Sequence, residues 1–317
     1  MSHPSSSTDS VEATSSSIPG APPSTAENAS PTVAFQGEPG AFSEEALLEH
    51  FQGQAASLPC RDFQGLVLAT QDGRADFGMI PVENSLAGTV APAYDAILQG
   101  GVEIVAERIL PIRHHLMALS GAGIGNLRKA LSHPVALAQC TGFLRHHPHI
   151  QPTVVHDTAG AAREVGERQD RSLAAIAPAG AARRYGLSIV ASDLQDRDDN
   201  QTRFYLIRKV GGGKASPATG RPDRFKTVLI VELPDQPGSL LQALDPFSRE
   251  ELNLAKLESR PAPVPWSYRF IVEVHGSMED PAMDRAVAAL ADSALTLRVL
   301  GSFPAGSAED TSGGDVT

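Results

Sequence analysis

The chain of 317 residues has room for about two domains of the usual size. Hydrophobic residues make up 41% and charged residues 20%, which is enough apolar surface for a packed core. The formal net charge of −11 argues against a nucleic-acid partner, whose backbone carries the same sign.

No apolar run approaches the roughly 18 residues that cross a bilayer, so we expect no membrane contact. The N-terminus has neither the basic and apolar regions of a secretory signal nor the arginines of an organelle transit peptide. Cys60 and Cys140 stand far apart, in no metal or redox spacing. We therefore expect reduced thiols and a cytoplasmic protein.

The composition divides the chain into five segments. Residues 1–31 and 305–317 are polar and low in bulky apolar residues, and we expect disordered tails there. A glycine-rich stretch at residues 211–224 reads as a linker. Two folded domains are expected between these segments, at residues 32–210 and 225–304.

The larger predicted domain begins with a strand at 32–36 and a glycine-rich turn. Ser43 follows as a helix cap with Glu44 and Glu45 in the first turn. Asp62 is predicted to cap a second helix. A buried strand at 76–80 then runs into the polar segment 81–90, and polar groups at the carboxyl end of a strand are typical of ligand sites in open α/β sheets.

Apolar and helical patterns then alternate to the end of this domain. Strands are predicted at 102–119 with a break at Pro111, and at 129–132, 153–156, 173–177, 188–191 and 201–208. Pro134, Asp157 and Pro178 begin the intervening helices. The alternation predicts a mainly parallel, layered α/β domain of two lobes, with crossovers near 111–113 and 190–200.

The order of elements changes after the linker. Strands are predicted at 226–233, 252–259, 268–274 and 295–301, with helices near 239–247 and 281–290. This βαββαβ order is the ferredoxin-like arrangement.

Residues 200–204, Asn-Gln-Thr-Arg-Phe, bring together a hydroxyl, a fixed positive charge and a ring at the mouth of a strand. Strand alternation places Thr202 and Phe204 on one face and Arg203 on the other. The histidines at 114–115 and 146–149 lack acidic partners at metal-ligand spacing, and we interpret them as surface residues. We expect chemistry without a metal or cofactor, by positioning, charge and one proton donor.

Six segments in this order carry a family resemblance: 34–44 (AFQGEPGAFSE), 81–85 (PVENS), 132–134 (SHP) with Gln139 and Cys140, 200–204 (NQTRF), 258–261 (ESRP) and 300–304 (LGSFP). Together they strongly resemble prephenate dehydratase with a C-terminal ACT regulatory domain, over roughly residues 32 to 304. The resemblance implies a two-lobed, periplasmic-binding-protein-like catalytic domain with prephenate in its cleft. It also implies conversion of prephenate to phenylpyruvate, water and carbon dioxide in phenylalanine biosynthesis.

The resemblance also implies roles for individual residues. Thr202 maps to the essential catalytic residue, and Arg203 is expected to position the anionic substrate. The expected substrate-binding residues are Phe42, Ser43, Glu83, Asn84, Ser85, Thr89, Gln139, Cys140, Arg203 and Phe204. Phenylalanine, the expected feedback inhibitor, maps to Gly238, Ser239, Leu240, Glu258, Ser259, Arg260 and Pro261, where Ser239 replaces the usual Ala. A homo-oligomer, dimer or tetramer, is expected because ACT domains commonly pair.

Two alternatives remain open from the sequence. Arogenate dehydratase performs the same chemistry on the transaminated substrate, and sequence separates the two poorly. A non-catalytic sensor of aromatic ligands would keep the two-lobed fold without turnover. Residues 1–31 are too short and polar to form a fused chorismate mutase.

Overall fold

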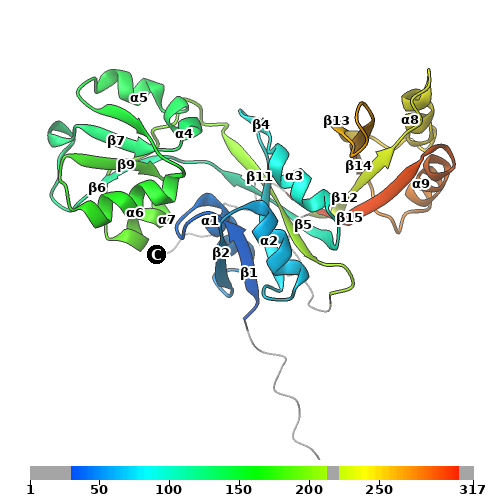
Figure 1. Cartoon of the computed structure of the whole chain (residues 1–317), viewed down its shortest axis with the longest axis horizontal. Coiled ribbons are helices and arrows are strands. Elements are labelled where there is room, and N and C mark those ends of the chain that lie inside the picture. The colour runs from blue at the N-terminus through cyan, green and yellow to red at the C-terminus, as the bar shows by residue number, and fades with distance from the viewer. Residues whose placement is uncertain (1–29, 213–220, 307–317) are drawn as a thin grey trace, which may run out of the picture. The chain divides into compact units, whose positions relative to one another are not determined.

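The computed structural model describes residues 30–212 and 221–306 (Figure 1). The predicted tails at 1–31 and 305–317 and the linker at 211–224 therefore lie largely outside the described residues. Residues 221–224 were predicted as linker, and this is wrong, because they already belong to strand β12 (Arg221–Glu232). No described helix is long and apolar enough to cross a membrane.

The first sheet has six strands in the order β2-β1-β3-β11-β5, with β4 added to β3. Its strands are β1 (Thr32–Gln36), β2 (Ala56–Cys60), β3 (Phe77–Asn84), β4 (Gly88–Thr89), β5 (Val102–Pro111) and β11 (Gln201–Lys209). Helices α1 (Phe42–His50), α2 (Phe63–Gln71) and α3 (Ala91–Leu98) belong to the same part of the chain. The strand β2 was not predicted from the sequence, because it is a short strand at the sheet edge and contains Pro59, which disfavours a strand assignment.

The second sheet has five strands in the order β10-β6-β9-β7-β8. They are β6 (His115–Ala118), β7 (Lys129–Ser132), β8 (Gln151–Val154), β9 (Leu173–Ala177) and β10 (Ser188–Ala191). The helices are α4 (Pro134–Ala138), α5 (Thr141–His146), α6 (Thr158–Arg168) and α7 (Ala179–Tyr185), with a 3-10 turn at Ile124–Asn126. Small residues dominate this core, as the fully buried Leu173–Ala177 strand shows.

The two sheets are mixed, so the mainly parallel arrangement predicted from the sequence is wrong. β11 runs antiparallel to both β3 and β5, and β6 runs antiparallel to β9 and β10. The chain leaves the first sheet after β5, builds the second sheet, and returns along β11. An outgoing and a returning strand that lie side by side must run in opposite directions. The α/β class itself is confirmed.

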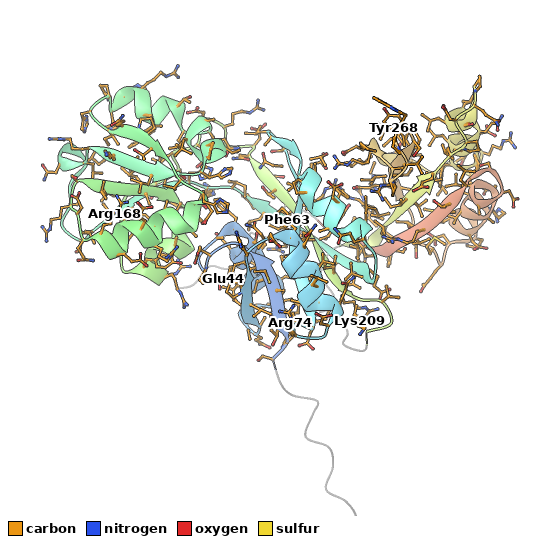
Figure 2. All side chains as sticks on the ribbon, viewed as in Figure 1. Glu44, Phe63, Arg74, Arg168, Lys209 and Tyr268 are labelled. Atoms are coloured by element: carbon orange, nitrogen blue, oxygen red, sulfur yellow. The ribbon has the colours of Figure 1, made fainter. Side chains whose placement is uncertain are left out.

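The third sheet has four antiparallel strands in the order β13-β14-β12-β15. Its elements follow the chain as β12, α8 (Ser239–Arg249), β13 (Leu254–Pro261), β14 (Tyr268–His275), α9 (Pro281–Ser293) and β15 (Thr296–Ala305). This confirms the βαββαβ arrangement. The edge strand β13 leaves Leu257 in solvent, and the loop after it leaves Trp266 in solvent. Tyr268, the first residue of β14, is half-exposed (Figure 2).

Alternation along β12 decides what each face of the third sheet contacts. Leu229 and Val231 pack with the core residues of α8 and α9. Val228 and Ile230 join the same apolar cluster as Tyr94 of α3 and residues of the first sheet. At Gly301 of β15 a Cβ atom would lie 2.1 Å from the Ile104 carbonyl oxygen of β5, so only glycine permits this backbone approach.

Helix α1 carries an acidic residue that titrates unusually. Burial, and secondarily the charge of Glu49, raise the pKa of Glu45 to about 7, although Arg183 of α7 acts in the opposite direction. Ordinary glutamate in the unfolded chain titrates near 4.5. Folding therefore holds a proton between these two pH values that the unfolded chain releases.

We predict that Glu45→Gln stabilises the protein at pH 8 and leaves its stability unchanged at pH 4.5. The ionised wild-type side chain costs folding free energy above pH 7, on the order of 1–3 kcal/mol at the 1.36 kcal/mol per pKa unit of linkage. Denaturant unfolding of both proteins at the two pH values measures the difference. A variant that is equally stable or less stable at pH 8 would contradict this account.

Candidate active site

The register of β3 against β11 determines which side chains meet. Thr202 pairs with Asn84 and Arg203 pairs with Glu83, and directly opposite residues on antiparallel strands share a face. The two pairs therefore project from opposite faces of the sheet. The register then shifts, so that Phe204 pairs with Pro81, which is a β-bulge next to the site.

Thr202 and Asn84 face a cavity of about 380 Å³ that is lined from both lobes. Its size suits a small organic ligand. From the first lobe and the returning strand come Gln36, Gly37, Ala41, Phe42, Ser43, Pro81, Asn84, Ala87, Val90, Thr202 and Phe204. From the crossover and the second lobe come Ile112, His114, His133, Val135, Ala136, Gln139, Asp157 and Thr158.

The hydroxyl of Thr202 is held from behind by one amide. Asn84 Nδ2 donates to Thr202 Oγ1 at 3.0 Å, and also lies 2.9 Å from Asn200 Oδ1 and 3.0 Å from the Gln201 carbonyl oxygen. The Asn84 carbonyl accepts the main-chain amides of the following turn, which fixes the side-chain orientation. Because the Thr202 oxygen accepts from Asn84, its own hydrogen is left to donate into the cavity.

A chain of side-chain hydrogen bonds continues from this pair to the second lobe. Asn200 Nδ2 donates to Gln139 Oε1 at 3.0 Å, and the same oxygen lies 2.9 Å from His114 Nε2. An amide oxygen only accepts, so the proton of neutral His114 sits on Nε2. Burial lowers the pKa of His114, which keeps the ring neutral. His114 Nδ1 has no hydrogen-bond partner within residues 30–212 and 221–306.

The lobes also touch at the loop that precedes α1. Tyr185 Oη of α7 donates to the Pro39 carbonyl oxygen at 2.8 Å. A Cβ atom on Gly40, whose φ is +91°, would lie 2.7 Å from Cα of Ala181. This contact holds the start of α1 beside the cavity.

Main-chain N–H groups at the start of α1 are the groups in the cavity that can attract an anion. Of the residues that the structure describes, no lysine or arginine lines it. The first N–H groups of a helix lack intrahelical acceptors and attract anions. Phe42 and Ser43, both in the lining, begin α1, and the Ala41 cap makes no side-chain hydrogen bond to the helix. The prediction that Ser43 caps this helix is therefore wrong, because the helix begins one residue before it.

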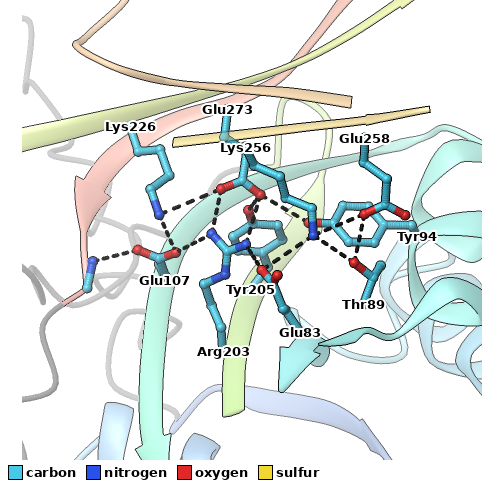
Figure 3. A network of polar contacts seen from close by, with 11 residues as sticks. Glu83, Thr89, Tyr94, Glu107, Arg203, Tyr205, Lys226, Lys256, Glu258 and Glu273 are labelled. Carbon is cyan, nitrogen blue, oxygen red and sulfur yellow. Dashed lines mark hydrogen bonds and ion pairs between the residues drawn. The ribbon is translucent and has the colours of Figure 1, made fainter. Parts of the chain in front are cut away.

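The structure therefore groups Phe42, Ser43, Asn84, Gln139, Thr202 and Phe204 around the cavity, as the resemblance implied. Arg203 and Glu83 do not line this cavity, so the prediction that they bind the substrate there is wrong. Arg203 binds Glu83 on the face turned toward the third sheet, together with Glu107 of β5 and Glu273 of β14 (Figure 3). Strand alternation is the physical reason, because both residues precede or follow a cavity-facing neighbour.

Three more expected contacts are also corrected. Thr89 Oγ1 donates to Glu258 of β13 at 2.7 Å and points away from the cavity. The Ser85 hydroxyl donates to the Asp199 carbonyl oxygen and accepts from the Gln201 amide, so it pins the turn before β11. Cys140 is fully buried in the core of the second lobe, where burial raises the pKa of its thiol to about 12.

Sequence reasoning missed several lining residues. His114 was interpreted as a surface residue, and this is wrong, because only 2% of it is exposed. Its position three residues after the break at Pro111 was the available signal, since crossover segments run past the cleft between lobes. Asp157 was predicted as a helix cap and does accept from the Gly160 amide, but it also lines the cavity.

Comparison with known proteins decides the family. Residues 33–211 match the prephenate dehydratase model and residues 227–292 match the ACT domain model. The chain belongs to the prephenate dehydratase family.

Individual relatives agree with this assignment. The chain is 38% identical over 290 residues to arogenate dehydratase 2 of Petunia hybrida, covering 87% of this chain and 72% of that protein. It is 36% identical over 274 residues to the bifunctional chorismate mutase/prephenate dehydratase of Aquifex aeolicus, covering 86% and 73%. The solved prephenate dehydratase of Arthrobacter aurescens in complex with L-Phe superposes with a TM-score of 0.78 at 31% identity, covering 86% and 90%.

The segments expected to bind phenylalanine lie at one end of the ACT domain. Gly238 caps the start of α8 with φ of +88°, just after β12 ends. β12 and β13 both run antiparallel to β14, so their carboxyl termini lie at the same end of the sheet. Glu258 and Arg260 of β13 thus lie at the same end of the sheet as residues 238–240.

We predict that Asn84→Asp lowers kcat by about 100-fold, within the range that general-acid help contributes. A carboxylate accepts where the amide donated, so the Thr202 hydrogen turns toward it and away from the cavity. The turn is preserved, because one oxygen still accepts the Leu86 and Ala87 amides. Steady-state turnover of prephenate is the measurement.

Asn126→Asp is the matched control, since it adds the same charge at an exposed 3-10 turn in the second lobe. The control should keep wild-type kcat. Turnover by Asn84→Asp within two-fold of wild type would show that Asn84 does not orient the hydroxyl.

Proposed function

We propose that this prephenate dehydratase uses the Thr202 hydroxyl as the donor that assists departure of the substrate's ring hydroxyl. The reaction is the decarboxylative dehydration of prephenate to phenylpyruvate. One observation carries the proposal. Thr202 lines the cavity, and its Oγ1 accepts a hydrogen bond from Asn84 at 3.0 Å, so its hydrogen is left to donate toward the space where substrate would bind.

The reaction needs little from the protein beyond placement. The bond from the ring to its carboxylate breaks and releases carbon dioxide, and the electron pair enters the ring. Hydroxide leaves from the opposite carbon and becomes water with a proton that comes from solvent through the Thr202 hydroxyl. Aromatisation drives the step, and no proton leaves carbon. A donor on the departing oxygen is the group that speeds it, typically by about 10²–10⁴.

The cavity wall favours loss of the ring carboxylate. Phe42, Val90, Ile112 and Phe204 present apolar surface. A carboxylate held by a strong cation would be stabilised before it reacts, which slows its loss. We propose that the amides at the start of α1 take the other carboxylate of the substrate, on the pyruvyl side chain, and leave the reacting one in the apolar part.

We predict that Thr202→Ala lowers kcat by at least about 100-fold, with KM within a few-fold, because the donor is lost and the binding surface stays. Thr202→Ser keeps a hydroxyl and should retain more turnover than the alanine variant. Appearance of phenylpyruvate from prephenate measures both. A near-normal kcat in the alanine variant would remove Thr202 from the mechanism.

Arogenate is the second candidate substrate, and the same assay separates the two. Arogenate carries an ammonium group where prephenate carries a keto group, and the carboxylate of Asp157 lines the cavity. The Petunia hybrida relative is named an arogenate dehydratase. The larger kcat/KM in parallel assays with the two substrates assigns the activity. Turnover of neither by folded protein would leave the sensor alternative.

We also propose feedback inhibition by phenylalanine and a homo-oligomer built through the ACT domain. The Arthrobacter relative was solved with L-Phe. The edge strand β13 and α8 leave Leu257 and Leu241 exposed, which suits pairing with a second copy.

Cys60 and Cys140 are free thiols, which supports our proposal of a reducing compartment such as the cytoplasm.

We predict that L-phenylalanine binds the full chain, lowers turnover, and raises the thermal midpoint of unfolding, as a ligand of the folded state must. Calorimetry measures binding and the thermal midpoint, and inhibition assays measure turnover, each with L-leucine as comparison ligand. Light scattering tests the proposed homo-oligomer. If millimolar phenylalanine neither binds nor inhibits, the regulatory role is refuted. Turnover measured without phenylalanine tests the activity separately.

A further inference from the structure

The ACT domain contacts β3 and β11, the two strands that carry Asn84 and Thr202, on the face of the sheet opposite the cavity. Thr202 and Asn84 face the cavity, and their chain neighbours Arg203 and Glu83 project from the opposite face. Charged residues of the third sheet meet them there, in a network without a ligand role in the mechanism above (Figure 3).

Glu273 of β14 is the centre of this network. It is fully buried, and Arg203 binds both of its oxygens, Nη1 to Oε2 at 2.5 Å and Nη2 to Oε1 at 3.1 Å. The hydroxyls of Tyr205 and Tyr94 donate to the same carboxylate at 2.7 and 3.1 Å. Burial alone would raise the pKa of Glu273, but Arg203 and Lys226 outweigh it and hold the pKa below its ordinary value. The carboxylate therefore stays ionised and remains bound to Arg203.

A second contact holds the strand that carries Asn84. Lys256 Nζ of β13 lies 3.3 Å from Glu83 Oε2 and donates to Thr89 Oγ1 at 2.9 Å. Thr89 in turn donates to Glu258 at 2.7 Å. Each partner of the Thr202–Asn84 hydrogen bond is thus next in sequence to a residue that the ACT domain holds. Arg203 follows Thr202 and binds Glu273, and Glu83 precedes Asn84 and contacts Lys256. Thr89, which pairs with Glu83 across β3 and β4, also binds Lys256.

Apolar packing and the Gly301 contact already hold the third sheet against the first. A buried ion pair adds little net stability, because desolvation of the charges offsets their attraction. What the pairs add is a defined position. Consecutive Cα atoms are about 3.8 Å apart, so a displaced Arg203 shifts Thr202 as well. Misplacement of a reacting group by about 1 Å can cost up to roughly 100-fold in rate.

We propose that Arg203 is a positioning residue, and that Glu273 of the ACT domain holds it so that the Thr202 hydroxyl is aligned for catalysis. The inference rests on the proposed function. It makes the ACT domain a structural part of the active site, and it gives phenylalanine a route to kcat. An effector that moves β13 and β14 loosens Arg203 and Glu83 without touching the cavity.

The test compares Glu273→Gln in two backgrounds of the full chain. In the wild-type background the amide cannot hold the guanidinium by charge, and kcat on prephenate should fall about ten-fold with KM within two-fold. In the Thr202→Ala background the same substitution should change the residual rate by less than two-fold, since the aligned hydroxyl is already gone. General damage to the fold would lower both rates equally.

Glu250→Gln is the matched control. It removes a carboxylate that binds Arg285 through both oxygens, at 3.0 and 2.6 Å, inside the ACT domain and away from the first sheet. It should leave kcat unchanged. If Glu273→Gln does not fold, Arg203→Lys carries the test, because lysine keeps the charge but lacks the fork that reaches two carboxylates.

The outcomes separate the inference from the proposed function. Wild-type kcat in folded Glu273→Gln or Arg203→Lys, or an equal loss in both backgrounds, would overturn the positioning role. A rise in KM with constant kcat for Arg203→Lys would instead show that Arg203 binds substrate directly. Absence of turnover in the wild-type chain would overturn the proposed function itself.

Discussion

The antiparallel pairing of β3 with β11 is the constraint on which the rest of the structure depends. It joins residues more than a hundred positions apart and sets Asn84 opposite Thr202. The hydrogen bond between them leaves the threonine hydrogen free for a ligand. A slip of one residue in this register would turn both side chains to the other face. The bulge at Pro81, beside the site, fixes the register locally.

The same pairing gives the sheet two functional faces. One face carries the hydroxyl and its amide, and the other carries Arg203 and Glu83. A cation beside the reacting carboxylate would stabilise it in the ground state, so there is a chemical benefit in keeping Arg203 away from the cavity. Main-chain amides at the start of α1 are a milder source of positive potential. The positive charge of Arg203 instead serves to position the neighbouring Thr202 hydroxyl.

Much of the fold followed from local patterns. The acidic first turn of α1, Asp62 and Asp157 as helix caps, and the βαββαβ order after residue 225 all depend on neighbours in sequence. The strand β2 and the antiparallel direction of β11 did not follow. Both depend on which distant strand lies alongside, and alternation within a strand carries no information about its partner.

The sequence by itself determined the family resemblance, the order of elements, and the division of Thr202 and Arg203 between opposite faces, because a strand alternates with period two. Only the tertiary structure decided what each face meets. It placed buried His114 and its partner Gln139 in the lining of the cavity that Thr202 faces, put Cys140 in the core, and set Arg203 against Glu273. These contacts join parts of the chain that are remote in sequence, so they are fixed by the packing of the lobes and of the ACT domain.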